Sequence, residues 1–151
     1  MQTESLEFHI LSKDKYKEHF KYPLHYNLIH INRLYPGFSS WYLDKMWYNI
    51  GNKYDVILCT SYNKIVGVCI VNMIKNKICT LYVNEEFRHN GVGTHLIELA
   101  KQITNSTFPE INFKGVVYDC MYPFLIKQGY SDITVDYSYD TSTDIYQFKP
   151  R

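Results

Sequence analysis

The stretch ICTLYVNEEFRHNGVGTHL, residues 78–96, is the most informative part of this sequence. It begins as a β-strand, passes through a short polar loop, and enters a helix near Gly91. Gly91 and Gly93 carry no Cβ atom, so the backbone there can turn sharply and approach a ligand closely. The free N–H groups of the first helical turn, the helix dipole and the charge of Arg88 together favour a bound anion such as a diphosphate.

Two common nucleotide-binding loops do not match this stretch. The dinucleotide fingerprint needs a third glycine, where this chain has Leu96, and a parallel βαβ unit. A Walker loop needs Gly-Lys-Ser/Thr, which is absent from the stretch. Glycines at a helix start also serve the turn itself, so a purely structural role stays open at this point.

The chain before the stretch predicts helices first and strands second. Apolar residues at helical spacing over 24–34 precede Pro36-Gly37, and a short helix is expected over 40–49 with Ser39 or Ser40 as its N-cap. Runs of Val, Ile, Cys and Thr then predict a three-stranded antiparallel meander. Its strands are expected at 55–60, 65–74 and 77–83, after a first strand at 6–11.

The chain after the stretch begins with an amphipathic helix, because Val92, Leu96, Leu99 and Ile103 fall on one helical face. The pattern shows no repeat, linker or internal boundary, so we expect one domain spanning residues 1–151, with an α/β (α+β) fold. The last elements are expected as a strand at 111–117, a helix at 121–128 and strands at 133–139 and 145–148.

Composition and charge narrow the class of protein. Hydrophobic residues make up 46% and charged residues 21% of the chain, as in a globular domain. A net charge of +1 provides no field for nucleic acid or an anionic membrane. No apolar run approaches the roughly 20 residues that span a bilayer, and the first residues lack signal-peptide features. We therefore expect a cytoplasmic protein with no membrane partner.

The cysteines and histidines show no metal-ligand spacing, so no metal is predicted. Cys59, Cys69 and Cys79 each lie in an apolar run of β type, where a buried thiol is ordinary. Isolated histidines such as His25 and His30 are expected to be packed or solvated side chains.

The stretch resembles the acyl-CoA motif of the GNAT superfamily, Arg/Gln-x-x-Gly-x-Gly/Ala. Arg88, Gly91 and Gly93 occupy its fixed positions, and the order of the predicted elements is similar over most of the chain. The resemblance implies a mixed, mostly antiparallel central sheet flanked by about four helices. It also implies an acyl-CoA-dependent N-acetyltransferase that uses acetyl-CoA.

The resemblance further implies which residues contact the cofactor. Backbone amides over 88–94 are expected to hold the CoA pyrophosphate, and the backbone over 81–83 to pair with the pantetheine arm. In this family the first two helices border the acceptor cleft, so their aromatic residues either shape a pocket or belong to the core. The implied cofactor residues are Leu81, Tyr82, Val83, Arg88, His89, Asn90, Gly91, Val92, Gly93 and Thr94.

The catalytic positions depart from the family's pattern. Many members have a tyrosine four residues before the glycine that closes the last helix, where this chain has Leu125. Tyr118 or Tyr122 is then the candidate to protonate the departing thiolate. Glu85, just past the cofactor strand, is a candidate base, and it is equally expected as a solvated residue near a helix start.

The leading hypothesis is transfer of an acetyl group from acetyl-CoA, by direct attack of an amine. The acceptor is a small molecule, a protein lysine or an N-terminus. One alternative is a catalytically weak acyl-CoA-binding regulatory module. The leucine at position 125, where many family members have a tyrosine, favours this alternative. Another is an acyltransferase acting on a nucleic-acid-linked amine, which only the aromatic N-terminal region favours. The sequence leaves monomer and homodimer open.

Overall fold

The computed structural model describes residues 5–33, 36–88, 90–104, 110–114, 124, 127–128, 130–137 and 144–150. Its strands form one seven-stranded sheet in the order β1-β2-β3-β4-β5-β7-β6. Neighbours are antiparallel except β4 and β5, which are parallel, so the predicted mixed and mostly antiparallel sheet is confirmed. The strands are β1 (Leu6–Ile10), β2 (Tyr54–Ser61), β3 (Lys64–Asn72), β4 (Lys77–Val83), β5 (Glu110–Lys114), β6 (Tyr130–Tyr137) and β7 (Asp144–Pro150).

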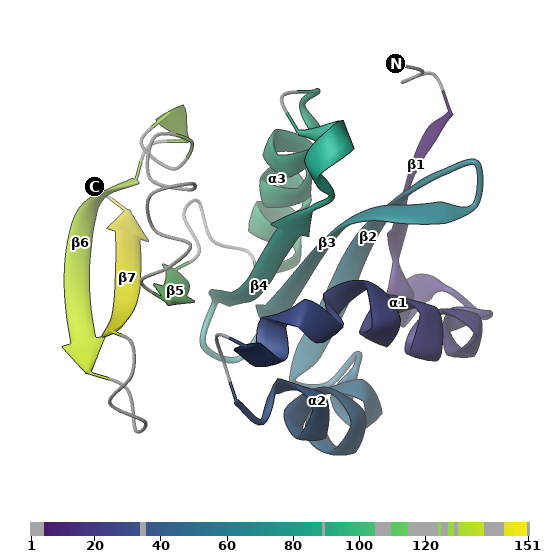
Figure 1. Cartoon of the computed structure of the whole chain (residues 1–151), viewed down its shortest axis with the longest axis horizontal. Coiled ribbons are helices and arrows are strands. Elements are labelled where there is room, and N and C mark those ends of the chain that lie inside the picture. Colours follow the sequence, from purple (N-terminus) through teal and green to yellow (C-terminus); the bar gives the residue numbers. More distant parts are fainter. Residues whose placement is uncertain are drawn as a thin grey trace.

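Helices lie on both faces of the sheet (Figure 1). One face carries α1 and α2 with the short turns around them, and the other carries α3. None of the helices within the described residues is long and apolar enough to cross a membrane. The predicted helix at 121–128 is described only at 124 and 127–128. The helical elements are η1 (Leu11–Lys13), η2 (Lys17–Phe20), α1 (Lys21–Leu28), η3 (Ile29–Arg33), α2 (Phe38–Trp41), the π-turn η4 (Tyr42–Met46), η5 (Trp47–Asn49), η6 (Glu85–Phe87) and α3 (Val92–Thr104).

Two apolar clusters, one on each face, form the core. In β2, Val56 and Leu58 pack on the α1 side, while Ile57 and Cys59 pack on the α3 side. Every residue of β2 is buried, which explains why the middle of the strand, residues 56–59, is a continuous apolar run rather than an alternating one. Along α2, η4 and η5, the buried aromatic residues are Phe38, Tyr42 and Trp47, and the partly buried Trp41 packs against the same cluster.

Gly67 sets how closely α3 approaches the sheet. A Cβ atom at this position would lie 2.9 Å from Cγ1 of Val92 and 3.4 Å from Cδ1 of Leu96. Val92 is β-branched and stiff in a helix, so it could not move aside easily. The missing side chain at Gly67 therefore lets the first turn of α3 sit directly on β3.

A hydrogen-bonded network joins α1 to α2, and it corrects one prediction. The N-cap position of α2 is Gly37, with φ of 89° and no capping side chain, so the expected cap at Ser39 or Ser40 is wrong. The Ser39 hydroxyl instead lies 2.7 Å from Nε2 of His25 and accepts a hydrogen bond of 2.6 Å from Nδ2 of Asn32. Ser39 is thus used to link two helices rather than to begin one.

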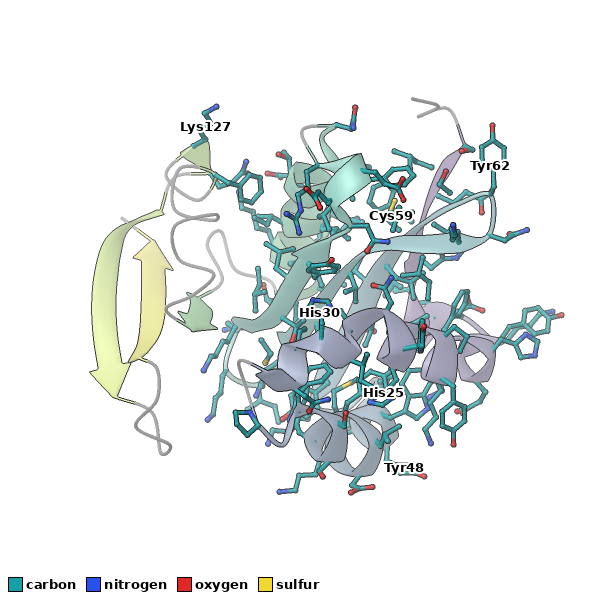
Figure 2. All side chains as sticks on the ribbon, in the orientation of Figure 1. His25, His30, Tyr48, Cys59, Tyr62 and Lys127 are labelled. Atoms are coloured by element: carbon teal, nitrogen blue, oxygen red, sulfur yellow. The ribbon has the colours of Figure 1, made fainter. Side chains whose placement is uncertain are left out.

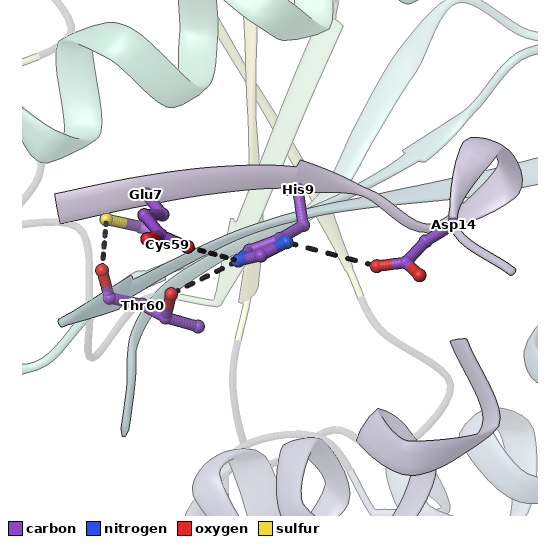
Figure 3. Close-up of polar contacts among 5 residues, drawn as sticks. All are labelled: Glu7, His9, Asp14, Cys59 and Thr60. Atoms are coloured by element: carbon purple, nitrogen blue, oxygen red, sulfur yellow. Dashed lines mark hydrogen bonds and ion pairs between the residues drawn. The ribbon is translucent and has the colours of Figure 1, made fainter. Parts of the chain in front are cut away.

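A second polar cluster fastens the edge strand β1 (Figure 3). Nε2 of His9 lies 3.1 Å from the Thr60 hydroxyl on β2, and its two ring nitrogens each lie 3.9 Å from a carboxylate oxygen, of Glu7 and of Asp14. The cluster therefore ties β1 both to β2 and to the segment after η1. Because β1 is at one edge of the sheet and β4 is in its middle, this cluster lies apart from the segment of residues 78–96.

The environment of His25 predicts how stability changes with pH. Burial lowers the pKa of His25 from its ordinary 6.5, because the charged imidazole loses hydration. The unfolded chain then takes up a proton at higher pH than the folded chain does. The free energy of unfolding should therefore fall as the pH drops below about 6.5 and through the lowered pKa.

Urea unfolding of the wild type and of His25→Gln at several pH values between about 5 and 8 measures this effect. We expect the variant to lose less stability than the wild type on acidification. His19→Gln, which removes an exposed histidine, should behave like the wild type. Identical pH dependence in the wild type and His25→Gln would show that His25 is not the responsible group.

Candidate functional site

A bulge in β4 opens the middle of the sheet. Ile70 of β3 is opposite Thr80, but the next residue, Val71, is opposite Ile78, so Cys79 is an extra residue in β4. A bulge of this kind bends its strand and increases the local twist. The bulge at Cys79 lies at the point where β4 stops pairing with β5.

Beyond the bulge, β4 and β5 separate. Within the described residues they pair only through Lys77 with Glu110 and Ile78 with Ile111. β5 continues to Lys114 and stays paired with β7 on its other edge, but its residues after Ile111 are not paired with β4. The edge of β4 after Cys79 is therefore left without a strand partner among the residues that the structure describes.

The open edge presents backbone groups of Leu81 and Val83. The N–H of Asn84 donates to the carbonyl of Val66 in β3 at 2.8 Å, so the groups of Asn84 point toward β3. Because successive residues of a strand alternate in direction, Tyr82 also points toward β3, while Leu81 and Val83 point toward the gap. This edge thus offers the N–H groups of Leu81 and Val83 and the C=O group of Leu81 to an extended ligand, while the Val83 carbonyl accepts a hydrogen bond from Arg88.

The loop after β4 leads directly to the start of α3. Gly91 has φ of 82°, in the left-handed region that favours glycine, and its carbonyl accepts the N–H of His95 at 3.0 Å. The N–H groups at the first turn of α3 are consequently free of partners within the helix, and they attract anions. Arg88 and Asn90 are exposed beside this turn, whereas His89 lies outside the described residues.

Arg88 connects this loop to the open strand. Its Nε atom donates to the carbonyl of Val83 at 2.8 Å, and its guanidinium carbon lies 5.6 Å from the centre of the Tyr82 ring. Both contacts hold the side chain against the end of β4, at the beginning of the loop that leads to α3. A full positive charge at this point adds to the partial charge of the helix dipole.

The two glycines of the loop serve different purposes. A Cβ atom at Gly91 would meet nothing within 4 Å, so this residue is required for its backbone conformation. At Gly93 a Cβ atom would lie 3.1 Å from Cζ of Phe124, so this residue is required for close packing. Gln128 reinforces the same contact, because its Nε2 donates to the Thr94 hydroxyl at 3.1 Å.

The chain matches a known family in sequence and known acetyltransferases in fold. The model of the acetyltransferase (GNAT) family matches residues 15–107, which is more than half of the chain. The chain belongs to the GNAT acetyltransferase family. No curated protein is significantly similar to it in sequence.

Solved structures share the GNAT fold with this chain at low sequence identity. A putative GNAT acetyltransferase from Desulfovibrio desulfuricans has a TM-score of 0.70 and 11% identity, over 95% of this chain and 96% of that one. A GNAT acetyltransferase from Elizabethkingia anophelis with acetyl-CoA bound has a TM-score of 0.64 and 14% identity, over 97% of both chains. Nourseothricin acetyltransferase has a TM-score of 0.54 and 13% identity, and the match covers 65% of each chain, slightly less than two thirds.

The predicted catalytic residues of this GNAT protein are placed only in part. Tyr118, Tyr122 and Leu125 lie outside the described residues. Glu85 is exposed at the start of η6, one residue beyond Asn84. A covalent role for Cys79 is disfavoured, because burial raises the pKa of its thiol to about 11, despite an opposing effect of nearby lysines.

Two side chains to which the sequence analysis gave no functional role lie beside the open strand. The His30 ring is 4.5 Å from the Tyr82 ring, and Nδ2 of Asn27 lies 3.3 Å from Oδ1 of Asn84. Asn27 and His30 are three residues apart, a spacing that places both on one side of a helix. That spacing was the available signal in the sequence, but it does not reveal which strand the pair contacts.

The packing of Gly93 predicts a stability effect that does not depend on any ligand. Gly93→Ala should lower the free energy of unfolding by about 1–3 kcal/mol, because the added methyl group meets the ring of Phe124. In a Phe124→Ala background the same substitution should cost less, since the ring is gone. Denaturant unfolding of the four proteins measures this coupling. An equal cost in both backgrounds would assign the need for glycine to something other than Phe124.

Proposed function

We propose that this GNAT protein is an acyl-CoA-dependent N-acyltransferase that moves an acetyl group from acetyl-CoA to an amine. One observation carries the proposal: the open edge of β4 leads without interruption to a helix start that is suited to a diphosphate. The family match supports acyl transfer in general. We treat residues 1–151 as one acyltransferase domain, because a single sheet includes strands from both halves of the chain.

The residues present fit acetyl-CoA at both ends of this path. The backbone of Leu81, Tyr82 and Val83 is extended and can take the pantetheine arm as an added strand. The first turn of α3 can take the diphosphate. The residues proposed to hold it are Arg88, His89, Asn90, Gly91, Val92, Gly93 and Thr94.

Bound acetyl-CoA supplies a thioester, whose carbonyl carbon accepts an amine and whose sulfur leaves as a thiolate. The N–H groups of Leu81 and Val83 are the nearest preorganised donors for the carbonyl oxygen along the open edge, and such donors stabilise developing negative charge. Tyr118 or Tyr122 is proposed to protonate the sulfur, and Glu85 to act as a base. The three described cysteines are free thiols, which suits the cytoplasmic location that we also propose.

Calorimetry with two ligands tests the first part of the proposal. CoA should bind at least about tenfold more tightly than pantetheine, which has the same arm but no diphosphate. The reason is that the free N–H groups at the first turn of α3 and the charge of Arg88 act only on the diphosphate. Equal affinities would mean that this helix start is not the phosphate site.

Gly91→Asp tests the position of the diphosphate more directly. We expect it to weaken CoA binding by about 100-fold or more, because it sets a negative charge against the phosphates. Arg88→Ala should weaken binding less, and its effect should shrink at high salt.

The chain offers a matched control for Gly91→Asp. Gly37 also begins a helix, with φ of 89°, and a Cβ atom there would likewise meet nothing within 4 Å. Gly37→Asp therefore imposes the same backbone strain elsewhere in the chain, and it should leave CoA affinity unchanged. A folded Gly91→Asp protein with wild-type affinity would contradict the assignment.

A further inference from the structure

Around the open edge of β4, we assign the cofactor and the acceptor amine to opposite faces of the sheet. Leu81 and Val83 direct their side chains to the α3 side, where the helix start proposed for the diphosphate also lies. The acceptor amine must therefore reach the thioester from the opposite face, which carries α1 and η3. This step rests on the function proposed above.

On that opposite face, His30 lies directly over the open part of β4. Its ring is 4.5 Å from the Tyr82 ring, with an angle of 52° between the planes, and Figure 2 shows it between the α1 ribbon and β4. Tyr82 is the residue between Leu81 and Val83, whose backbone groups point into the gap. The imidazole is thus close to the place where the thioester carbonyl is expected. Tyr82 is a titratable side chain that lies against the imidazole, and Arg88 lies over the same Tyr82 ring.

An amide network holds the His30 segment against the end of β4. Asn27, one turn before His30, donates to Oδ1 of Asn84 at 3.3 Å and to the carbonyl of Ile65 at 3.4 Å. Nδ2 of Asn84 donates to the same Ile65 carbonyl at 3.3 Å. These bonds join α1, β3 and the end of β4, so the position of His30 over Tyr82 is fixed from several elements.

The same network contains an unusual acceptor. Oδ1 of Asn27 is buried, and it is the one buried side-chain polar atom of the described residues that has no hydrogen-bond partner. Buried polar atoms without partners are rare and call for a specific explanation. The unpaired atom lies in the same junction of α1, β3 and the end of β4 that positions His30.

We propose that His30, in place of the exposed Glu85, is the general base that takes a proton from the acceptor amine. An alkyl ammonium group gives one proton to the neutral imidazole, and the resulting amine forms a C–N bond to the thioester carbon. The C–S bond then breaks, and its electron pair goes to sulfur. Tyr118 or Tyr122, as proposed above, protonates the thiolate and regains a proton from the second N–H of the attacking nitrogen, and the imidazolium returns its proton to solvent. The products are an amide, the free thiol and one released proton.

The test compares two amines that differ in their need for a base. Ethylamine is protonated at pH 7, as is lysine with a pKa of about 10.4, whereas hydroxylamine is largely neutral. Thiol release from acetyl-CoA is measured with each amine, for the wild type and for His30→Gln. We expect the variant to be slower with ethylamine by about 100-fold or more, and to change little with hydroxylamine.

Three controls separate a base from a structural residue. CoA affinity and circular dichroism should be unchanged in His30→Gln. His19→Gln removes another histidine that stacks on a tyrosine, Tyr16 at 5.7 Å, and should retain wild-type rates. Free imidazole should restore ethylamine turnover to His30→Ala without accelerating the wild type.

The outcomes distinguish this inference from the proposed function. Failure of the wild type to bind CoA would overturn the proposed function. If CoA binds, any of three results would overturn the role of His30. The wild type could release thiol at a rate that does not depend on ethylamine, or His30→Gln could retain the wild-type rate. The third is that His30→Gln loses the same fraction of its rate with ethylamine and with hydroxylamine.

Discussion

The extra residue in β4 is the constraint on which the rest of the site depends. A regular β4 would stay paired with β5, and its backbone groups would be used within the sheet. With Cys79 inserted, pairing with β5 ends at Ile78, and among the residues that the structure describes the next part of β4 has only β3 as a neighbour. The strand stays ordered because one side is still bonded, while the other side is available to a ligand.

The helix that follows has to begin at the end of this half-open strand, and small residues make that possible. Gly67 lets α3 rest on β3, and Gly93 lets Phe124 approach the first turn. The contact between Gln128 and Thr94 then links a segment near the end of the chain to the same turn. The helix start is thus fixed from the sheet and from the C-terminal part of the chain.

The sequence predicts the parts of this arrangement that depend on local pattern. The strands of the meander, the helix at Val92 and the glycine-bearing loop follow from apolar periodicity and from the conformational freedom of glycine. The bulge does not follow, because Cys79 lies in an apolar run like those of Cys59 and Cys69, and only its register with β3 sets it apart. The N-cap prediction at Ser39 failed for a similar reason. The Ser39 hydroxyl contacts Asn32 and His25, and rules for helix caps do not include such contacts between helices. His30 was predicted only as a packed or solvated side chain, because its neighbour Tyr82 is distant in sequence.

Amide hydrogen exchange, measured by NMR with and without saturating CoA, tests whether the open edge of β4 binds the pantetheine arm of CoA. The N–H groups of Leu81 and Val83 should exchange faster than that of Tyr82 in the free protein, because only Tyr82 points toward β3. Saturating CoA should slow both by at least about tenfold and leave Tyr82 unchanged. If CoA binds and the exchange of Leu81 and Val83 does not change, the ligand lies elsewhere and the account is wrong.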